Sequence, residues 1–210
     1  MANLHQKTLF DILTQHQAYL YRASSRSVNE LLNLFNSETV TMLDKLANLL
    51  DELNEKEKAA LAGGIYSTAN LREIRALISQ WFNLINEALT DTFTISAVAL
   101  AFYEARYMSK IFGGQHKELK GEQLYKAAKR VPLAGGALVD ELLSKIAELA
   151  RQRVEYAIRD GLNIGQPYKL FSVFMELNVL NMKMGYSIVL KQILNELYVQ
   201  FEAIYPIRHI

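Results

Sequence analysis

Four histidines are the side chains best suited to metal binding or proton transfer, and they are scattered along this 210-residue chain: His5, His16, His116 and His209. None belongs to a His-Glu-x-x-His pattern, and the Glu-x-x-His pairs typical of di-iron helical bundles are absent. His16 falls on the apolar stripe of the first expected helix, where a hydrogen-bonded histidine of the core or its rim is a better interpretation than a metal ligand. The sequence therefore predicts no metal site.

Nucleotide binding and covalent catalysis also lack a sequence pattern. Gly113-Gly114 and Gly135-Gly136 are followed neither by Gly-Lys-Ser/Thr nor by a third glycine, so they are interpreted as helix ends and turns. No serine lies in a Gly-x-Ser-x-Gly elbow, and the absence of cysteine excludes disulfides, thiolate sites and a cysteine nucleophile. We expect a protein that is not an enzyme and has no cofactor; an enzyme whose site is assembled from scattered polar residues is the least favoured alternative.

Charge is balanced over the whole chain but uneven along it. The 23 lysines and arginines face 22 acidic residues, a formal charge of +1, which gives no overall field to recruit DNA or anionic membrane. Residues 38–57 hold six acids and two lysines, whereas residues 106–130 hold seven basic residues and two acids. The seven basic residues are Arg106, Lys110, Lys117, Lys120, Lys126, Lys129 and Arg130.

Mixed-charge segments of this kind are usually solvated loops, and that interpretation stays open. The sharper hypothesis is that the seven basic residues form an interaction surface. There, lysine and arginine side chains would contact DNA phosphates without sequence specificity, or would dock the acidic segment of a neighbouring subunit.

The elements that position these residues are expected to be helices. Half of the residues are hydrophobic, only three are proline, and apolar residues recur at helical spacing almost everywhere. The most apolar run, residues 95–102, is far shorter than the roughly 20 residues of a membrane span, and the N-terminal residues lack a signal-peptide pattern. We expect a soluble, intracellular, all-α protein, an elongated bundle of long amphipathic helices.

Three regions are expected along the chain. Residues 1–112 form an N-terminal long-helix region, residues 113–136 a glycine-rich basic connector with a short helix, and residues 137–210 a C-terminal helical region that packs on the first. Within the first region, Ser-Val-Asn-Glu at 27–30 and Ser-Glu-Thr at 37–39 predict helix starts, and Gly63-Gly64 predicts a stop. The β-branched residues within 90–94 predict a bend or break.

The second half of the chain shows further helix boundaries. A short helix is expected at about 122–129, before a turn at Val131-Pro132, and a long amphipathic helix at about 137–160. Gly161 is expected to cap that helix, and Gly165 to form a tight turn before a helix that begins at Pro167. This predicts a helix-turn-helix corner near Gly161–Pro167. A last helix is expected from about 179 to 205.

Two stretches resemble a known family. Residues 9–22, Leu-Phe-Asp-Ile-Leu-Thr-Gln-His-Gln-Ala-Tyr-Leu-Tyr-Arg, look like the first helix of tailed-phage minor head, or head morphogenesis, proteins. Residues 131–136, Val-Pro-Leu-Ala-Gly-Gly, precede an amphipathic helix that leads into Ala-Ile-Arg-Asp-Gly-Leu-Asn-Ile-Gly at 157–165, which is similar to the family's helix-turn-helix module. Arg159, Gly161 and Gly165 are the turn residues that match it. The resemblance covers the family's helical N-terminal region only.

The resemblance implies a non-enzymatic virion protein, present in few copies at the portal or inner head and involved in head assembly, DNA packaging or DNA ejection. Its partners would be the portal or capsid protein and further copies of itself, and it would be assembled in the host cytoplasm. The chain lacks the Arg-Thr dipeptide common in the family's further C-terminal portion, so no enzymatic activity of that portion is implied. The alternative is a soluble helical adaptor that binds one protein partner.

Overall fold

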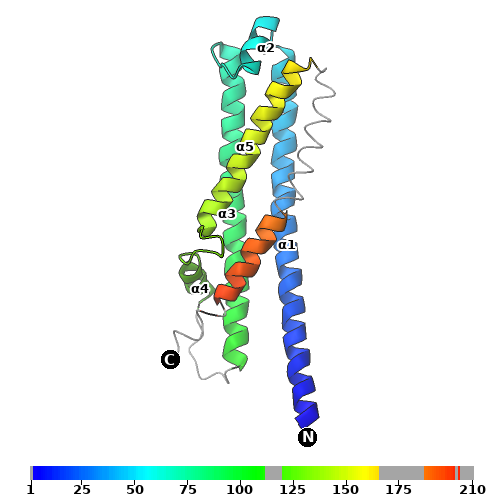
Figure 1. The fold of residues 1–210 in the computed structure, drawn as a ribbon, viewed down its shortest axis with the longest axis vertical. Coiled ribbons are helices and arrows are strands. Elements are labelled where there is room, and N and C mark those ends of the chain that lie inside the picture. Colours follow the sequence, from blue (N-terminus) through cyan, green and yellow to red (C-terminus); the bar gives the residue numbers. More distant parts are fainter. Residues whose placement is uncertain (1, 112–119, 166–186, 202, 204–210) are drawn as a thin grey trace. The chain divides into compact units, whose positions relative to one another are not determined.

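The computed structural model describes residues 2–111, 120–165, 187–201 and 203, with the backbone alone at 2–10, 13, 110 and 111. The elements are α1 (Ala2–Asp51), α2 (Glu55–Ala62), α3 (Ala69–Ile111), α4 (Gly121–Ala128) and α5 (Val139–Asn163) (Figure 1). Residues 187–201 form a further helical segment. No strand occurs in these described ranges, so the predicted all-α class is confirmed.

The chain divides into two compact units, each built from segments that are distant in sequence. The first unit comprises Met1–Glu30, Thr92–Val139 and Val189–Ile210. The second comprises Leu31–Asp91 and Asp140–Ile188. Because α1 and α3 extend over both ranges, each helix contributes residues to both units. The three consecutive regions expected from the sequence, 1–112, 113–136 and 137–210, stay a prediction.

Helix α1 is continuous over 50 residues, so the two helix starts predicted at 27–30 and 37–39 are wrong. In the sequence, these hydroxyl residues resemble helix caps. In the structure, two of the hydroxyl groups donate hydrogen bonds to backbone carbonyls of the preceding turn instead. The Ser37 hydroxyl donates to the Leu34 carbonyl at 3.0 Å, and the Thr39 hydroxyl donates to the Phe35 carbonyl at 2.6 Å. A serine or threonine satisfied in this way can remain inside a helix.

Helix α3 is also continuous, over 43 residues, and the bend predicted at 90–94 is wrong. The Thr90 hydroxyl donates to the Asn86 carbonyl at 2.8 Å, and the Phe93 side chain is completely buried. The helix-propensity cost of a β-branched residue is at most about 0.7 kcal/mol, whereas burying a phenylalanine contributes about 1.5–3 kcal/mol. Packing therefore outweighs propensity in this part of α3.

Helix α2 begins at a capping box that the sequence interpretation missed, because the apolar spacing of α1 continues through Leu53. The Asn54 side chain accepts hydrogen bonds from the backbone amides of Lys56 and Glu57, each at 3.0 Å. The Glu57 carboxylate in turn accepts a hydrogen bond from the backbone amide of Asn54 at 3.2 Å. The predicted stop after α2 is confirmed, since Gly63 caps the helix and Gly64 has a φ of +74°.

The helices after residue 120 differ from the predicted ones mainly at their ends. The expected short helix is α4, and the expected helix at about 137–160 is α5. Gly161 is not the cap of α5: it is buried within the last turn, and Gly165, with a φ of +63°, forms the turn after the helix. Pro167, and the expected ends of the last helix near 179 and 205, lie outside the described residues.

The Glu57 carboxylate joins the cap of α2 to the start of α3. The Thr68 hydroxyl donates to Glu57 Oε1 at 2.7 Å, and Thr68 Oγ1 accepts the Leu71 amide at 3.4 Å. The hydrogen bond from Thr68, followed by that from the Asn54 amide, lowers the pKa of Glu57 below its ordinary value of 4.5. The ionised form of Glu57 is therefore the one that stabilises this connection.

Replacing this carboxylate should change the acid sensitivity of the fold. A lowered pKa gives stability that is present above pH 4.5 and is lost as the pH falls through the lower pKa of the folded state. We expect Glu57→Gln to lower the free energy of unfolding at pH 7, and the difference from wild type to shrink as the pH falls below 4.5, measured by urea denaturation. Glu55→Gln, which removes an exposed ion pair with Lys58, is the control and should have a smaller effect at pH 7. A difference between Glu57→Gln and wild type that is independent of pH would contradict this account.

Candidate functional site

Gly121, the first residue of α4, sets how closely α4 packs on α3. A Cβ atom at this position would lie 2.7 Å from the Val98 carbonyl oxygen and 2.8 Å from the Phe102 backbone nitrogen. One turn further along α4, the buried Tyr125 places its hydroxyl 3.5 Å from Thr94 Oγ1. The two helices therefore run side by side, with glycine at the point of closest approach.

A groove with a volume of about 920 Å³ lies along this contact, within the first unit. Its α3 wall includes Ile95, Val98 and Phe102, and its α4 wall includes Lys126 of α4 together with the two capping residues Lys120 and Lys129. Ile95 is 71% exposed and Phe102 49% exposed. We call this cavity the lysine groove, since its α3 wall is apolar and its α4 wall is cationic.

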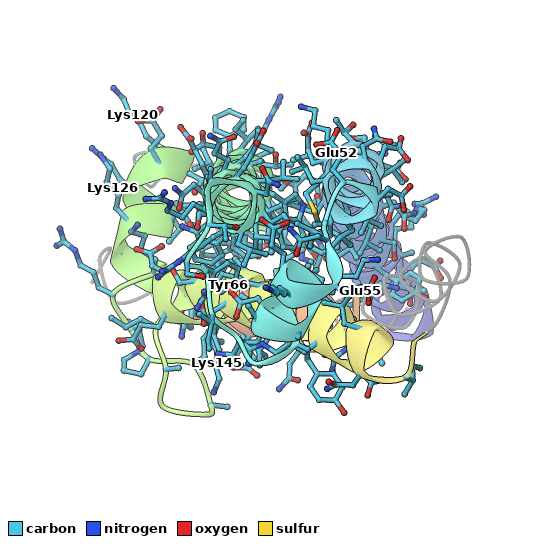
Figure 2. The ribbon with its side chains drawn as sticks, turned by 90° about the horizontal axis from the view of Figure 1, so that it is seen from above. Glu52, Glu55, Tyr66, Lys120, Lys126 and Lys145 are labelled. Atoms are coloured by element: carbon cyan, nitrogen blue, oxygen red, sulfur yellow. The ribbon has the colours of Figure 1, made fainter. Side chains whose placement is uncertain are left out.

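The three lysines differ in their surroundings. Lys120 and Lys126 are exposed, and Figure 2 shows both side chains extending outward from α4. Lys129 is half-buried, with its ammonium group 5.8 Å from the centre of the Tyr125 ring. Glu122 is the acidic residue among the described residues of the lining. The groove is therefore net positive beside an exposed apolar surface, which suits a partner that is both acidic and apolar.

Among the described residues of the predicted surface, Arg106 and Arg130 are not part of this lining. Arg106 is exposed on α3, and Arg130 is exposed after α4. The side chain of Lys110 and all of Lys117 lie outside the described part of the chain. The structure thus brings together three of the seven predicted basic residues, Lys120, Lys126 and Lys129.

The residues of the family-like turn motif have a structural place in the second unit. The Arg159 guanidinium lies 3.8 Å from the Glu155 carboxylate and packs over Gly64, where a Cβ would be 3.4 Å from it. Gly161 is buried in α5, and Gly165 forms the turn after that helix. Arg159 therefore links α5 to the turn that follows α2.

The predicted core histidine is confirmed: His16 is 3% exposed and lies in a polar cluster of the first unit. Its Nδ1 is 3.2 Å from the Tyr103 hydroxyl, and its Nε2 is 2.8 Å from the Tyr198 hydroxyl. Nε2 is also 3.3 Å from the carboxylate of Glu104, which is fully buried. The imidazole stacks on Tyr107, with 3.5 Å between the ring centres.

This cluster joins α1, α3 and the helical segment 187–201 through polar contacts inside the apolar core of the first unit. Burial is the main cause that raises the pKa of Tyr103 above its ordinary value, and the neighbouring Tyr19 and Glu104 raise it further. The phenol therefore stays neutral and available for hydrogen bonding. Because His16 and Glu104 are both buried, we interpret the cluster as structural.

Within residues 2–111, 120–165, 187–201 and 203, no three or more histidine, aspartate or glutamate side chains gather closely enough to hold a metal ion. None of the helices in that same part of the chain combines the length and apolar character needed to cross a bilayer.

The apolar wall of the groove was missed by sequence reasoning. The residues around Val98 to Phe102 are apolar on more than one face, which predicts a central position for this part of α3; the structure buries Leu100 and Ala101 but exposes Phe102, and Ile95 nearby is exposed as well. A signal was present, since a helix that is apolar on two faces must pack on two sides or leave one in solvent. The position of Gly121 against α3 has no comparable signal in the sequence.

Comparison of the chain with protein-family models, with curated proteins and with solved structures found no match.

Adding a methyl group at the closest approach should separate α4 from α3. We expect Gly121→Ala to lower the free energy of unfolding by about 1–3 kcal/mol, because the new Cβ meets backbone atoms that cannot move away. Gly135→Ala is the control, since no atom lies within 4 Å of its added Cβ. Equal stability of the two variants in chemical denaturation would show that Gly121 does not set the contact.

Removing the hydroxyl that bonds His16 should destabilise the first unit. Tyr198→Phe leaves the buried Nε2 of His16 without its 2.8 Å partner, which should cost about 1–3 kcal/mol. Tyr156→Phe, at a tyrosine that is 69% exposed, should change the free energy of unfolding by less than about 0.5 kcal/mol. The two values are to be compared by urea denaturation at pH 7, and similar losses would argue against a structural role for the cluster.

Proposed function

We propose that this chain is a non-enzymatic structural protein of a tailed-phage virion, a minor head component that contacts the portal or capsid protein. The observation that carries the proposal of a binding role is the lysine groove, a cavity with one apolar and one cationic wall. The resemblance of residues 9–22 and 131–165 to minor head proteins supports the virion setting.

The groove suits the binding of a protein better than catalysis. Exposed apolar patches beside polar residues mark interaction sites, and an apolar groove between helices is a common binding site for an amphipathic helix. Its described lining consists of aliphatic and aromatic side chains, lysines, Thr94, Gly121 and Glu122, and none of these described residues is a histidine. We therefore assign it recognition of a partner, with no chemical step.

In this proposal the protein assembles in the host cytoplasm and becomes part of the inner head or the portal region. It would act in head assembly, in DNA packaging or in DNA ejection. Lys120, Lys126 and Lys129 would also allow contact with DNA phosphates without sequence specificity. The alternative is a helical adaptor that uses the same groove to bind one protein partner outside a virion.

Quantitative mass spectrometry of purified phage particles tests this proposal. We expect a fixed, low copy number of the chain in mature particles. Loss on triggered DNA release would make it an ejected component, and retention would make it a portal or shell component. Absence from both mature particles and immature heads would contradict the proposal and favour the adaptor.

Two double charge-reversal variants test whether the groove is the docking site. Lys120→Glu combined with Lys126→Glu reverses the cationic wall, and we expect it to lower the copy number per particle at least about tenfold, which corresponds to about 1.4 kcal/mol of binding free energy. Lys145→Glu combined with Arg153→Glu makes the same change in charge at exposed residues of α5 and should leave the copy number unchanged. Equal incorporation of both pairs would rule out the groove as the docking site.

A further inference from the structure

The outer face of α1 in the second unit carries a stripe whose chemistry matches the lysine groove. Met42, Leu46 and Leu50 are buried on the inner face of α1. The stripe beside this buried face, turned toward solvent, consists of Val40, Leu43, Asp44, Ala47 and Asp51. Their spacing of i, i+3, i+4, i+7 and i+11 places all five on one face of a helix.

This outer stripe of α1 has an aliphatic edge and an acidic edge. Val40 is 50% exposed, and Leu43 and Ala47 are partly exposed beside it. Asp44 and Asp51 are exposed along the adjoining edge. Asp51 is the last residue of α1, where the negative end of the helix dipole adds to its charge. The stripe is thus amphipathic and negative, and the groove is amphipathic and positive.

The spacing along the two surfaces also agrees. A helix rises 1.5 Å per residue, so Asp44 and Asp51, which are seven positions apart, are separated by about 10.5 Å along the axis. Lys120 and Lys126, which are six positions apart, are separated by about 9 Å, a difference that flexible lysine side chains can accommodate. On the apolar side, Ile95 and Phe102 are seven residues apart on α3, as Val40 and Ala47 are on α1.

We propose that the lysine groove of one copy of the chain binds the outer stripe of α1 of a second copy. The stripe's aliphatic edge lies against the α3 wall, and Asp44 and Asp51 face Lys120 and Lys126 on the α4 wall. This inference rests on the groove being the interaction surface proposed above, and it names the partner.

The contact joins two different surfaces, so it is head-to-tail. A bound pair leaves one groove and one stripe unoccupied, and such contacts generate a ring or an open array rather than a closed dimer. A formal charge of +1 per chain adds little repulsion to this growth.

Reversing the charges of the groove or of the stripe tests whether these two surfaces bind each other. Sedimentation velocity of the purified full chain should show association that increases with concentration and weakens with salt. Lys120→Glu with Lys126→Glu, or Asp44→Lys with Asp51→Lys, should each weaken association at least about tenfold, because like charges then face each other. A mixture of the two variants should associate again, since both opposite-charge contacts are then available.

Lys145→Glu with Arg153→Glu serves as the control for net charge and should associate like the wild type. Circular dichroism of each variant confirms that it is helical, as expected for changes at exposed residues. A chain that stays monomeric at every concentration, or loss of association that mixing does not restore, overturns the inference. These results are independent of the particle test: a monomeric chain found in virions refutes this pairing alone, and an associating chain absent from virions refutes only the virion role.

Discussion

The contact of Gly121 with the backbone of α3 is the constraint on which the candidate site depends. No side chain larger than hydrogen fits between the start of α4 and the Val98–Phe102 turn of α3. This close approach buries Tyr125 and places Lys120, Lys126 and Lys129 beside an exposed apolar face. A short helix with a modest apolar face of its own thereby becomes one wall of a groove.

The first unit needs a second set of contacts to hold α3 in place beneath this groove. The buried cluster around His16 provides them, since the imidazole binds Tyr103 of α3 and Tyr198 of the segment 187–201. Polar groups in an apolar interior stabilise only when their partners are correctly placed, so such a cluster favours one register of the three helices. The buried cluster around His16 and the lysines of the groove thus have separate roles in the same unit.

The sequence predicted the helical class, the short helix α4 and the buried state of His16, because each depends on local spacing of apolar residues. It failed at 37–39 and 90–94, where hydroxyl groups bond to carbonyls inside a helix and burial of Phe93 outweighs propensity, and at 27–30, where α1 continues without a break. It grouped seven basic residues by proximity in the chain, but only tertiary packing selects the three that line the groove. The apolar wall depends on which face of α3 meets α4, which spacing alone does not specify.

Photo-crosslinking from the groove tests the central claim that this surface binds a protein. A photoreactive phenylalanine analogue at Phe102, which is 49% exposed, would be irradiated in assembled particles, and the linked peptides identified by mass spectrometry. The account predicts crosslinks to residues 40–51 of another copy, or to a peptide of the portal or capsid protein. No intermolecular crosslink from position 102, with crosslinks from the same analogue at Tyr156 on α5, would contradict it.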